Sequence, residues 1–420
     1  MGIALDHDSN ITRTTDPHPD WTQSLFGGIG YEERSADLTA RLLAQVQRRN
    51  FVHNTYPDDT IYFLNGVAVW TIAPQRLSWI VEDYANQSPL SLTAPNTPSN
   101  LVMTNSLSTG PELTFGVNPA NMPVIGARYG RYDIEGSGDN QRYTGYARWP
   151  YQLSSLDKAS LNYIATRIDF TPPATYPNFR RQDVFLRYER LSALGSLVVD
   201  GGTTYYQPYG GEGTKGGLGR VTALYTLTSE SAVRLVLADQ ISDSATDLIR
   251  NVASVTATTV PVFPLEAAAA VPLSGSIVAT GDVYRSQRAE LTYVTRDGRI
   301  ESGLQAYTRR VDYLTLNQQD YHEDGARLTL AWVQSSAVRI YADAYYLKRT
   351  FPSLDERDSG RIGALGVTYR LTPTLLVSAE AGRIERESNI PLQNFVDRRV
   401  LLLLGYSTGP LYSPSRLYGR

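Results

Sequence analysis

Apolar and polar side chains alternate with a period of two along almost the whole chain, and helical periodicity is scarce. In residues 142–151 (RYTGYARWPY) the odd positions are aromatic or small, and the even positions carry mainly arginine, threonine and tyrosine. Strict alternation of this kind is typical of a strand with one apolar and one polar face. The pattern predicts an all-β protein with twenty strands, at residues 3–13, 22–33, 38–53, 59–73, 76–87, 100–117, 122–135, 140–154, 158–171, 180–192, 194–207, 216–229, 232–245, 282–296, 298–312, 319–334, 336–349, 357–371, 373–387 and 394–408.

The connections between the predicted strands alternate in length. Short ones include APQ (73–75), RDG (296–298) and SS (335–336), and long ones include SPLSLTAPNTPS (88–99) and KRTFPSLDERD (348–358). A soluble sheet has no reason to keep this order. An outer-membrane barrel does, because its periplasmic turns are short, its extracellular loops are long and its strands are even in number.

We therefore predict a single transmembrane antiparallel β-barrel over residues 1–408, with about 20 strands and about 18 as the alternative. The short connections would be periplasmic turns and the long ones extracellular loops. Both ends of the barrel then face the periplasm, and residues 409–420 form a C-terminal periplasmic tail.

The segment 76–89 (RLSWIVEDYANQSP) would be the fifth strand, with Trp79 low at the periplasmic interface and Tyr84 higher on the other face. Tyrosine and tryptophan favour this level of a membrane because their rings are amphipathic. The same reasoning predicts four membrane-interface aromatics: Trp79, Tyr143, Trp149 and Tyr151.

Several motifs in this part of the chain carry a family resemblance: Leu77-Ser78-Trp79, Glu82-Asp83, Pro95-Asn96-Thr97-Pro98-Ser99-Asn100 and Ser108-Thr109-Gly110-Pro111. They resemble the outer-membrane β-barrel porin family associated with exosortase (PEP-CTERM) and exopolysaccharide gene clusters. The close match covers about 40 residues. The opening ALDHDSNITRT (4–14) is also similar to the N-termini of mature proteins of this family. The ending, GYSTGPLYSPSRLYGR (405–420), departs from the family by extending past the last strand. The resemblance implies an outer-membrane location and a role near polysaccharide export.

Composition narrows the function classes. The 420-residue chain has a net charge of −3 and no cysteine, which excludes disulfides, thiolate catalysis and cysteine metal sites. The charge does not suggest a nucleic-acid partner. A transmembrane helix is excluded because no run approaches about 18 apolar residues. The start lacks a basic and apolar leader, so we expect a mature chain without its signal peptide, located in the bacterial outer membrane.

The basic residues are nearly all arginine: Lys158, Lys215 and Lys348 are the only lysines, against 36 arginines, and tyrosine reaches 28. Arginine suits bidentate recognition of carboxylate and phosphate, although genomic base composition can also favour it. Lumen residues tune what a barrel passes. The predicted lumen-lining or substrate-path residues are Arg128, Arg142, Tyr146, Arg148, Arg187, Arg234, Arg299, Glu301, Tyr307, Arg309, Arg339, Tyr341 and Asp343, and the same polar faces include Glu189, Arg327, Tyr345, Arg361 and Glu380. The alternative interpretation is a set of internal ion pairs that only stiffen the wall.

Catalytic signals are weak. The four histidines are His7, His18, His53 and His322, and the chain has no HExxH, GxSxG or P-loop motif. An enzyme site at the outer rim of the barrel would need a histidine near a loop, and only His322-Glu323-Asp324 is predicted to lie there. The stronger interpretation is that this segment is an ordinary solvated loop. We expect no catalytic residue, no metal site and no cofactor.

Residues 246–281 form the longest connection, and the segment is apolar and punctuated by proline. This character predicts a lid or plug packed against the barrel, with a mobile extracellular loop as the alternative.

We expect an outer-membrane channel for a polar solute, anionic or carbohydrate, in exopolysaccharide export. The alternatives are a general diffusion porin and a closed structural or adhesion barrel that displays surface loops. Expected partners are outer-membrane lipid and lipopolysaccharide, polysaccharide and the periplasmic export machinery, with no nucleic acid. The oligomeric state is not predicted.

Overall fold

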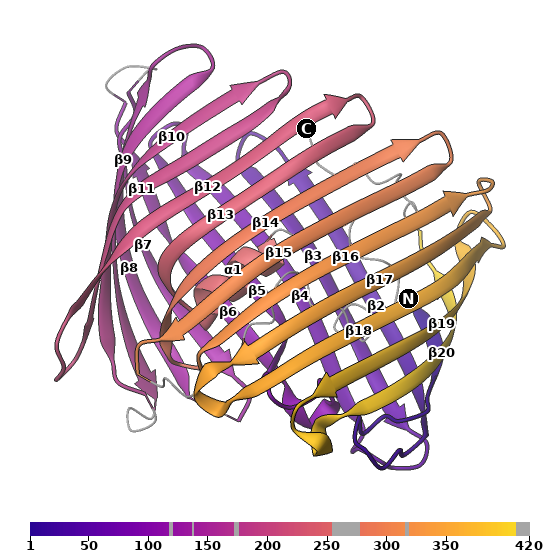
Figure 1. Ribbon diagram of the computed structural model, residues 1–420. Helices are drawn as coiled ribbons and strands as arrows, with labels where there is room; N and C mark the ends of the chain where they lie inside the picture. The colour runs from indigo at the N-terminus through magenta and orange to yellow at the C-terminus, as the bar shows by residue number, and fades with distance from the viewer. Residues whose placement is uncertain (117–120, 137, 172–175, 254–277, 316–318, 409–420) are drawn as a thin grey trace.

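The alternating segments pair with their sequence neighbours as antiparallel strands and close into a ring in the computed structural model (Figure 1). The structure describes residues 1–116, 121–136, 138–171, 176–253, 278–315 and 319–408. The ring closes because β1 pairs with both β2 and β20, so that Ile3 lies opposite Leu25 on one side and Leu404 on the other. The strands are β1 (Gly2–Asp8), β2 (Asp20–Arg34), β3 (Leu38–Phe51), β4 (Asp59–Ala73), β5 (Leu77–Pro89), β6 (Leu101–Thr114), β7 (Val124–Ile134), β8 (Asp139–Gln152), β9 (Asp157–Thr171), β10 (Phe179–Ser192), β11 (Gly195–Pro208), β12 (Thr214–Thr228), β13 (Ser231–Asp243), β14 (Val283–Asp297), β15 (Ile300–Tyr313), β16 (Tyr321–Val333), β17 (Val338–Phe351), β18 (Glu356–Arg370), β19 (Leu375–Ser388) and β20 (Phe395–Tyr406).

The predicted antiparallel barrel is confirmed, and each predicted strand has a counterpart. The fourth has the predicted bounds, 59–73. The largest error is at the first, predicted to run to residue 13, since β1 ends at Asp8. The prediction also missed a helix, α1 (Ser244–Ala253), which follows β13 directly. The other described helices are single 3₁₀ turns: η1 (Pro98–Asn100), η3 (Pro352–Leu354) and η4 (Pro391–Gln393).

The connections alternate as predicted, with three exceptions. The connections after β7 (135–138) and β17 (352–355), predicted to be long, have four residues each, and β17 runs two residues further than predicted. The connection after β6 (115–123), predicted to be short, has nine. Some turns are as tight as a hairpin allows. The two-residue turn between β14 and β15 has Gly298 at φ 56°, a left-handed conformation that glycine adopts without steric cost.

The outer face of the barrel carries an apolar band. Along β20 the outward side chains are Tyr406, Leu404, Leu402 and Val400, all exposed, followed by Arg398 nearer the loop end. Large exposed apolar surface is costly in water, and a closed barrel with such a band is built to cross a membrane. Near the short-turn end the outer face carries the exposed tryptophans Trp70, Trp79, Trp149 and Trp332.

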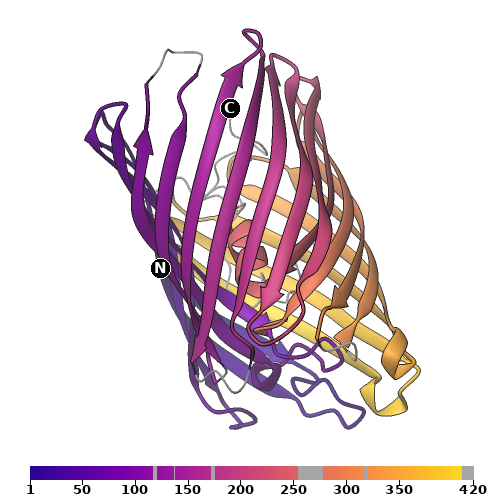
Figure 2. The ribbon, with the colours of Figure 1, turned by 90° about the vertical axis from the view of Figure 1, so that its left-hand side faces the viewer.

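Among the described residues, no helix has the length and apolar character needed to cross a membrane. Helix α1 instead lies inside the ring of strands, as both views show (Figures 1 and 2). The largest buried apolar cluster gathers around it and includes Ile61, Tyr84, Tyr132 and Leu248. The core of this barrel is therefore concentrated where loop segments meet the inner wall.

Candidate functional site

The candidate site is the lumen, and its loop end is crossed by the connection between β5 and β6, residues 90–100. Arg349 Nη1 on β17 donates to the Leu92 carbonyl oxygen at 3.1 Å, and Arg386 Nη2 on β19 donates to the Thr93 carbonyl oxygen at 2.6 Å. These strands lie far around the ring from β5 and β6. The loop therefore reaches across the lumen instead of projecting outward.

The same loop meets a second inward segment, residues 278–282, which leads into β14. The backbone N–H of Ala279 donates at 2.8 Å to the carbonyl oxygen of Pro89, the last residue of β5 before the loop. Leu92 and Val278 are both buried in a cluster with Tyr284, Tyr313 and other wall residues. Since backbone groups and apolar side chains of both segments are buried together, the two segments pack as one body.

Helix α1 is fixed at its start by the inner wall. Asp243 precedes the helix, and its Oδ1 accepts from the Thr246 backbone N–H at 3.1 Å, an N-cap contact. Arg142 on β8 and Arg181 on β10 also pair with Asp243, at 2.8 and 3.0 Å. Two arginines from the wall thus hold the point at which the chain leaves β13 and enters the lumen.

The first turns of α1 contact two sides of the lumen. Ala245 and Leu248 pack into the apolar cluster with Tyr84 and Tyr132. Asp247 is buried and accepts hydrogen bonds from Ser242 Oγ, Tyr284 OH and Arg309 Nη2, each at 2.8 Å. A buried carboxylate is tolerated where an opposite charge and several donors surround it. We call the described segments 90–100, 244–249 and 278–282 the plug.

A buried network in the wall supports the plug from behind. Glu323 is fully buried and accepts from Arg349 Nε at 2.8 Å and from Tyr307 OH at 2.9 Å. The hydroxyl of Tyr307 in turn contacts that of Tyr345 at 2.5 Å. Because Arg349 also donates to the Leu92 carbonyl, this network orients a guanidinium that contacts wall and plug together.

Asp282 lies at the end of the plug, outside the strands. Its carboxylate is buried and accepts from Thr315 Oγ1 at 2.8 Å and Thr280 Oγ1 at 3.1 Å. Burial raises the pKa of Asp282 above its ordinary value of 3.8, and the two hydroxyl donors oppose that shift. The plug therefore contains an acid whose neutral form is favoured by its surroundings.

Toward the short-turn end, the inner wall carries ion pairs in which the arginines are partly exposed and the carboxylates are largely buried. Arg187 Nε pairs with Asp200 Oδ1 at 2.7 Å, and Arg220 Nη2 pairs with Asp200 Oδ2 at 2.8 Å. Arg339 Nη2 lies 3.2 Å from Glu301 Oε2. Further contacts of this kind are Arg234–Glu290 at 3.3 Å, Tyr341–Glu380 at 2.7 Å and Tyr146–Glu112 at 2.8 Å. The wall therefore presents charge of both signs, with tyrosine between the pairs.

The strand register decides which predicted residues face the lumen. Arg299 lies in the exposed turn between β14 and β15, at the rim and not on the wall. Arg361, which the alternation had placed inside, points outward and pairs with Glu387. The remaining predicted lining residues lie on the inner face: Arg128, Arg142, Tyr146, Arg148, Arg187, Arg234, Glu301, Tyr307, Arg309, Arg339, Tyr341 and Asp343.

Those residues do not form one site. Arg142, Tyr307 and Arg309 belong to the contacts that hold the plug, whereas the others line the rest of the lumen. The four predicted interface aromatics, Trp79, Tyr143, Trp149 and Tyr151, all lie exposed on the outer face.

Sequence reasoning missed the plug anchors Arg349, Arg386, Glu323 and Asp247. Arg349 continues the inward positions of Arg339, Tyr341 and Asp343 on β17, so the alternation could have found it. The local sequence does not mark Asp247 as an anchor, because two of its three named partners, Tyr284 and Arg309, lie more than 30 positions away on other strands.

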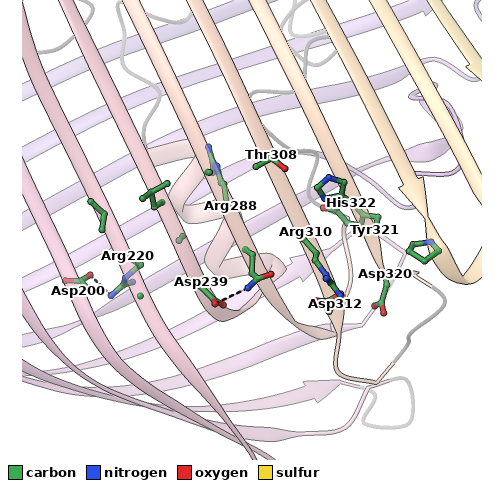
Figure 3. A pocket seen from close by; sticks show the side chains of 17 residues that line it. Asp200, Arg220, Asp239, Arg288, Thr308, Arg310, Asp312, Asp320, Tyr321 and His322 are labelled. Atoms are coloured by element: carbon green, nitrogen blue, oxygen red, sulfur yellow. Dashed lines mark hydrogen bonds and ion pairs between the residues drawn. The ribbon is translucent and has the colours of Figure 1, made fainter.

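A hollow of about 850 Å³ crosses strands β11 to β16 (Figure 3). Its lining combines inward side chains such as Arg220 and Arg288 with outward ones such as Asp239, Arg310 and His322. Since the lining belongs to both faces of the wall, this hollow is not an enclosed binding cavity.

The segment His322-Glu323-Asp324 is the place where the sequence offers a candidate rim enzyme site. His322 Nε2 lies 3.2 Å from Asp324 Oδ2 on the outer face of β16. Among the described residues, no three histidine or carboxylate side chains come together as around a metal ion. The expectation of no enzyme activity and no metal stays an expectation.

Comparisons with known proteins give only structural likenesses. No family model and no curated protein matches the chain. Similar solved structures include a mutant ferric enterobactin receptor from Pseudomonas aeruginosa bound to enterobactin (9% identity, TM-score 0.47, 96% of this chain and 81% of that chain). Others are the FrpB iron transporter from Neisseria meningitidis in its apoprotein form (8%, 0.46, 96% and 80%) and the copper transporter OprC (9%, 0.45, 96% and 80%). Because these TM-scores are below one half, the fold is assigned from the strand pairing and not from these likenesses.

Proposed function

We propose that this protein is a channel of the bacterial outer membrane whose lumen is closed at the loop end by the plug and passes a polar solute when the plug moves. The observation that supports this most directly is the pair of contacts from Arg349 and Arg386 to backbone carbonyls of loop 90–100. They hold the loop without covalent links, through side chains that can release it.

The solute class follows from the wall on the short-turn side of the plug. Half-exposed arginines and inward tyrosines suit a solute that carries both hydroxyl and carboxylate groups, since arginine binds carboxylates and sugar rings stack on aromatic rings. The carboxylate partners of these arginines reduce the excess of positive charge. We therefore propose an acidic carbohydrate in preference to a small inorganic anion.

The resemblance of residues 77–111 to the barrels of exosortase and exopolysaccharide gene clusters extends this proposal to polysaccharide export. Loop 90–100, which contains the matching motif Pro95–Asn100, is the loop that crosses the lumen. In that role the partners would be outer-membrane lipid and lipopolysaccharide, the polysaccharide and the periplasmic export machinery.

A second candidate is a closed structural barrel that displays its loops, and the buried ion pairs of the plug favour it. Buried pairs such as Arg309–Asp247 are costly to break by removing one partner, and they can hold a plug permanently. A general diffusion porin fits less well, because an unobstructed eyelet is what that function requires.

Single-channel recording in a planar bilayer separates these functions, with ion selectivity taken from the reversal potential. For the proposed channel we expect infrequent anion-selective openings that an acidic polysaccharide blocks. Deletion of residues 250–278 should raise the conductance. If neither the wild-type protein nor the deletion variant conducts although both are folded in the bilayer, the barrel is a closed structural one. Frequent unselective openings would instead identify a diffusion porin.

A further inference from the structure

Two pairs of arginines face each other directly across neighbouring strands on the outer surface. Arg167 on β9 lies opposite Arg180 on β10, and Arg383 on β19 lies opposite Arg398 on β20. Like charges directly opposite in a sheet repel each other. The arrangement is therefore unfavourable by itself, and an anion between the two guanidinium groups would offset the repulsion.

Both arginines of the first pair, Arg167 and Arg180, contact the ring of Tyr209. The guanidinium carbons of Arg167 and Arg180 lie 5.8 and 5.2 Å from the centre of the Tyr209 ring. Arg180 Nε also donates to the Tyr209 hydroxyl at 2.7 Å. A ring that both guanidinium groups contact restricts their rotamers, so that less side-chain entropy is lost when a ligand binds.

Neither pair is fully neutralised by its surroundings. Arg167 Nε contacts Asp169 Oδ1 at 3.0 Å, and Arg383 Nη2 contacts Glu385 Oε2 at 3.0 Å. Within the described ranges, Arg180 and Arg398 have no carboxylate in ion-pair contact. Each pair thus has one arginine with a carboxylate two residues further along its strand and one arginine whose charge is available.

Both pairs lie at the loop-side margin of the apolar band. Along the outer face of β10, the apolar side chains Leu186 and Val184 lie closer to the membrane centre than Arg180, which is nearer the loop end. On β20, Val400 and Arg398 are arranged in the same way. The opposite margin is marked mainly by aromatic side chains such as Trp149 and Trp332. The two margins differ in chemistry, which matches a membrane whose two leaflets have different headgroups.

We propose that each arginine pair binds a phosphate group on the headgroup of an anionic lipid in the leaflet at the loop end. The planar guanidinium fork pairs with two phosphate oxygens at once, and two forks on neighbouring strands can hold one phosphate from both sides. The bound phosphate offsets the repulsion within the pair. This inference rests on the membrane placement of the barrel and is independent of channel activity.

Binding of bisphosphorylated lipid A to the purified barrel in detergent tests the proposal. The comparison uses wild-type protein, the double variant Arg167→Gln/Arg180→Gln and the corresponding Arg383→Gln/Arg398→Gln. Arg357→Gln is the matched control, because Arg357 is an exposed arginine on β18, pairs with Asp355 and has Thr350 opposite it. Retained lipid is counted by native mass spectrometry, and thermal unfolding without lipid shows that each variant is folded.

We expect each double variant to lose one bound lipid and to weaken binding at that site by about a hundredfold, because it removes two guanidinium contacts that contribute about tenfold each. The control should bind as the wild type does. Equal losses in the control would overturn the proposal, since the effect would then follow total charge. The assignment to a lipid phosphate would be overturned if free inorganic phosphate bound at these sites as tightly as lipid A. It would also be overturned if phosphatidylcholine were retained as well as lipid A. A non-conducting barrel that binds lipid A at these sites would leave this inference standing while the channel function fails.

Discussion

Arg309 on β15 and Asp247 on α1 are joined by a buried contact of 2.8 Å between Nη2 and Oδ2. The pair connects the wall to a helix that the chain places inside the barrel. Because both groups are almost fully shielded from water, the contact is stronger than its counterparts on the outer face and is weakened little by salt. In the proposed channel, contacts of this kind hold the plug against the wall.

Replacing Asp247 by alanine should release α1 from the wall. The substitution removes a carboxylate acceptor from the buried Arg309 guanidinium, which costs about 3 kcal/mol. We expect faster amide exchange in residues 244–249 and a larger open fraction in bilayer recordings. The control is Asp312→Ala, since Asp312 pairs with Arg310 at 2.9 Å on the exposed outer face, where such pairs contribute about 0–1 kcal/mol. Equal behaviour of the two variants would show that the Asp247 contact does not hold the plug.

Replacing Arg349 by lysine should release loop 90–100 while keeping the charge beside Glu323. Arginine donates to Glu323 and to the Leu92 carbonyl from different nitrogens, and a single ammonium cannot reproduce that geometry. We expect proteases added from the loop side to cut within residues 90–100 in the variant and not in the wild type. Arg339→Lys, which changes the Glu301 pair far from the loop, serves as the control. Protection that survives in Arg349→Lys would assign the anchoring to Arg386.

Replacing Arg148 by glutamate should shift the channel toward cations. Arg148 faces the lumen on β8 and has no carboxylate within 4.0 Å among the described residues, so in the proposed channel its charge would act on passing ions. The substitution reverses one charge in a confined space, where water screens it poorly. The anion-to-cation permeability ratio, taken from the reversal potential, should fall severalfold. This change corresponds to about 1 kcal/mol of electrostatic free energy. Arg299→Glu, in the exposed turn at the rim, should have a smaller effect. An unchanged ratio in Arg148→Glu would mean that selectivity is set within the plug.

Acidification should tighten the plug through Asp282. Its pKa is raised in the folded protein, so the folded state binds more protons than the unfolded state between 3.8 and the raised pKa. The stabilising contribution is therefore fully present below 3.8 and is lost as the pH rises through the raised pKa. We expect a larger closed fraction at about pH 4 than at about pH 7.

The variant Asp282→Asn should remove most of this pH dependence, because the amide resembles the neutral acid at every pH. Asp320→Asn is the matched control: burial also raises the pKa of Asp320, but its Oδ1 accepts from the Tyr313 backbone N–H and not from the plug. A pH dependence that persists in Asp282→Asn and disappears in Asp320→Asn would assign it to the loop after β15.

The sequence by itself determined the barrel and the two faces of its wall. A period of two is a local property, so residues such as Tyr143 and Arg142 are assigned to opposite faces without knowledge of any distant contact. The alternating lengths of the connections then indicated an outer-membrane barrel with short turns at one end and long loops at the other. The error at Arg361 arose where the sequence SGRIGALG gives small side chains on both faces and the alternation loses contrast.

Only the tertiary structure decided which connections fold inward. Leu92 and Arg349 are 257 positions apart, and nothing in the sequence around either residue reveals the other. The start of α1 was read as the end of a strand, because its cap at Asp243 depends on Arg142 and Arg181, which belong to other strands. A loop that crosses the lumen is stabilised by groups that the closed ring brings together, and that proximity does not exist until the barrel has formed.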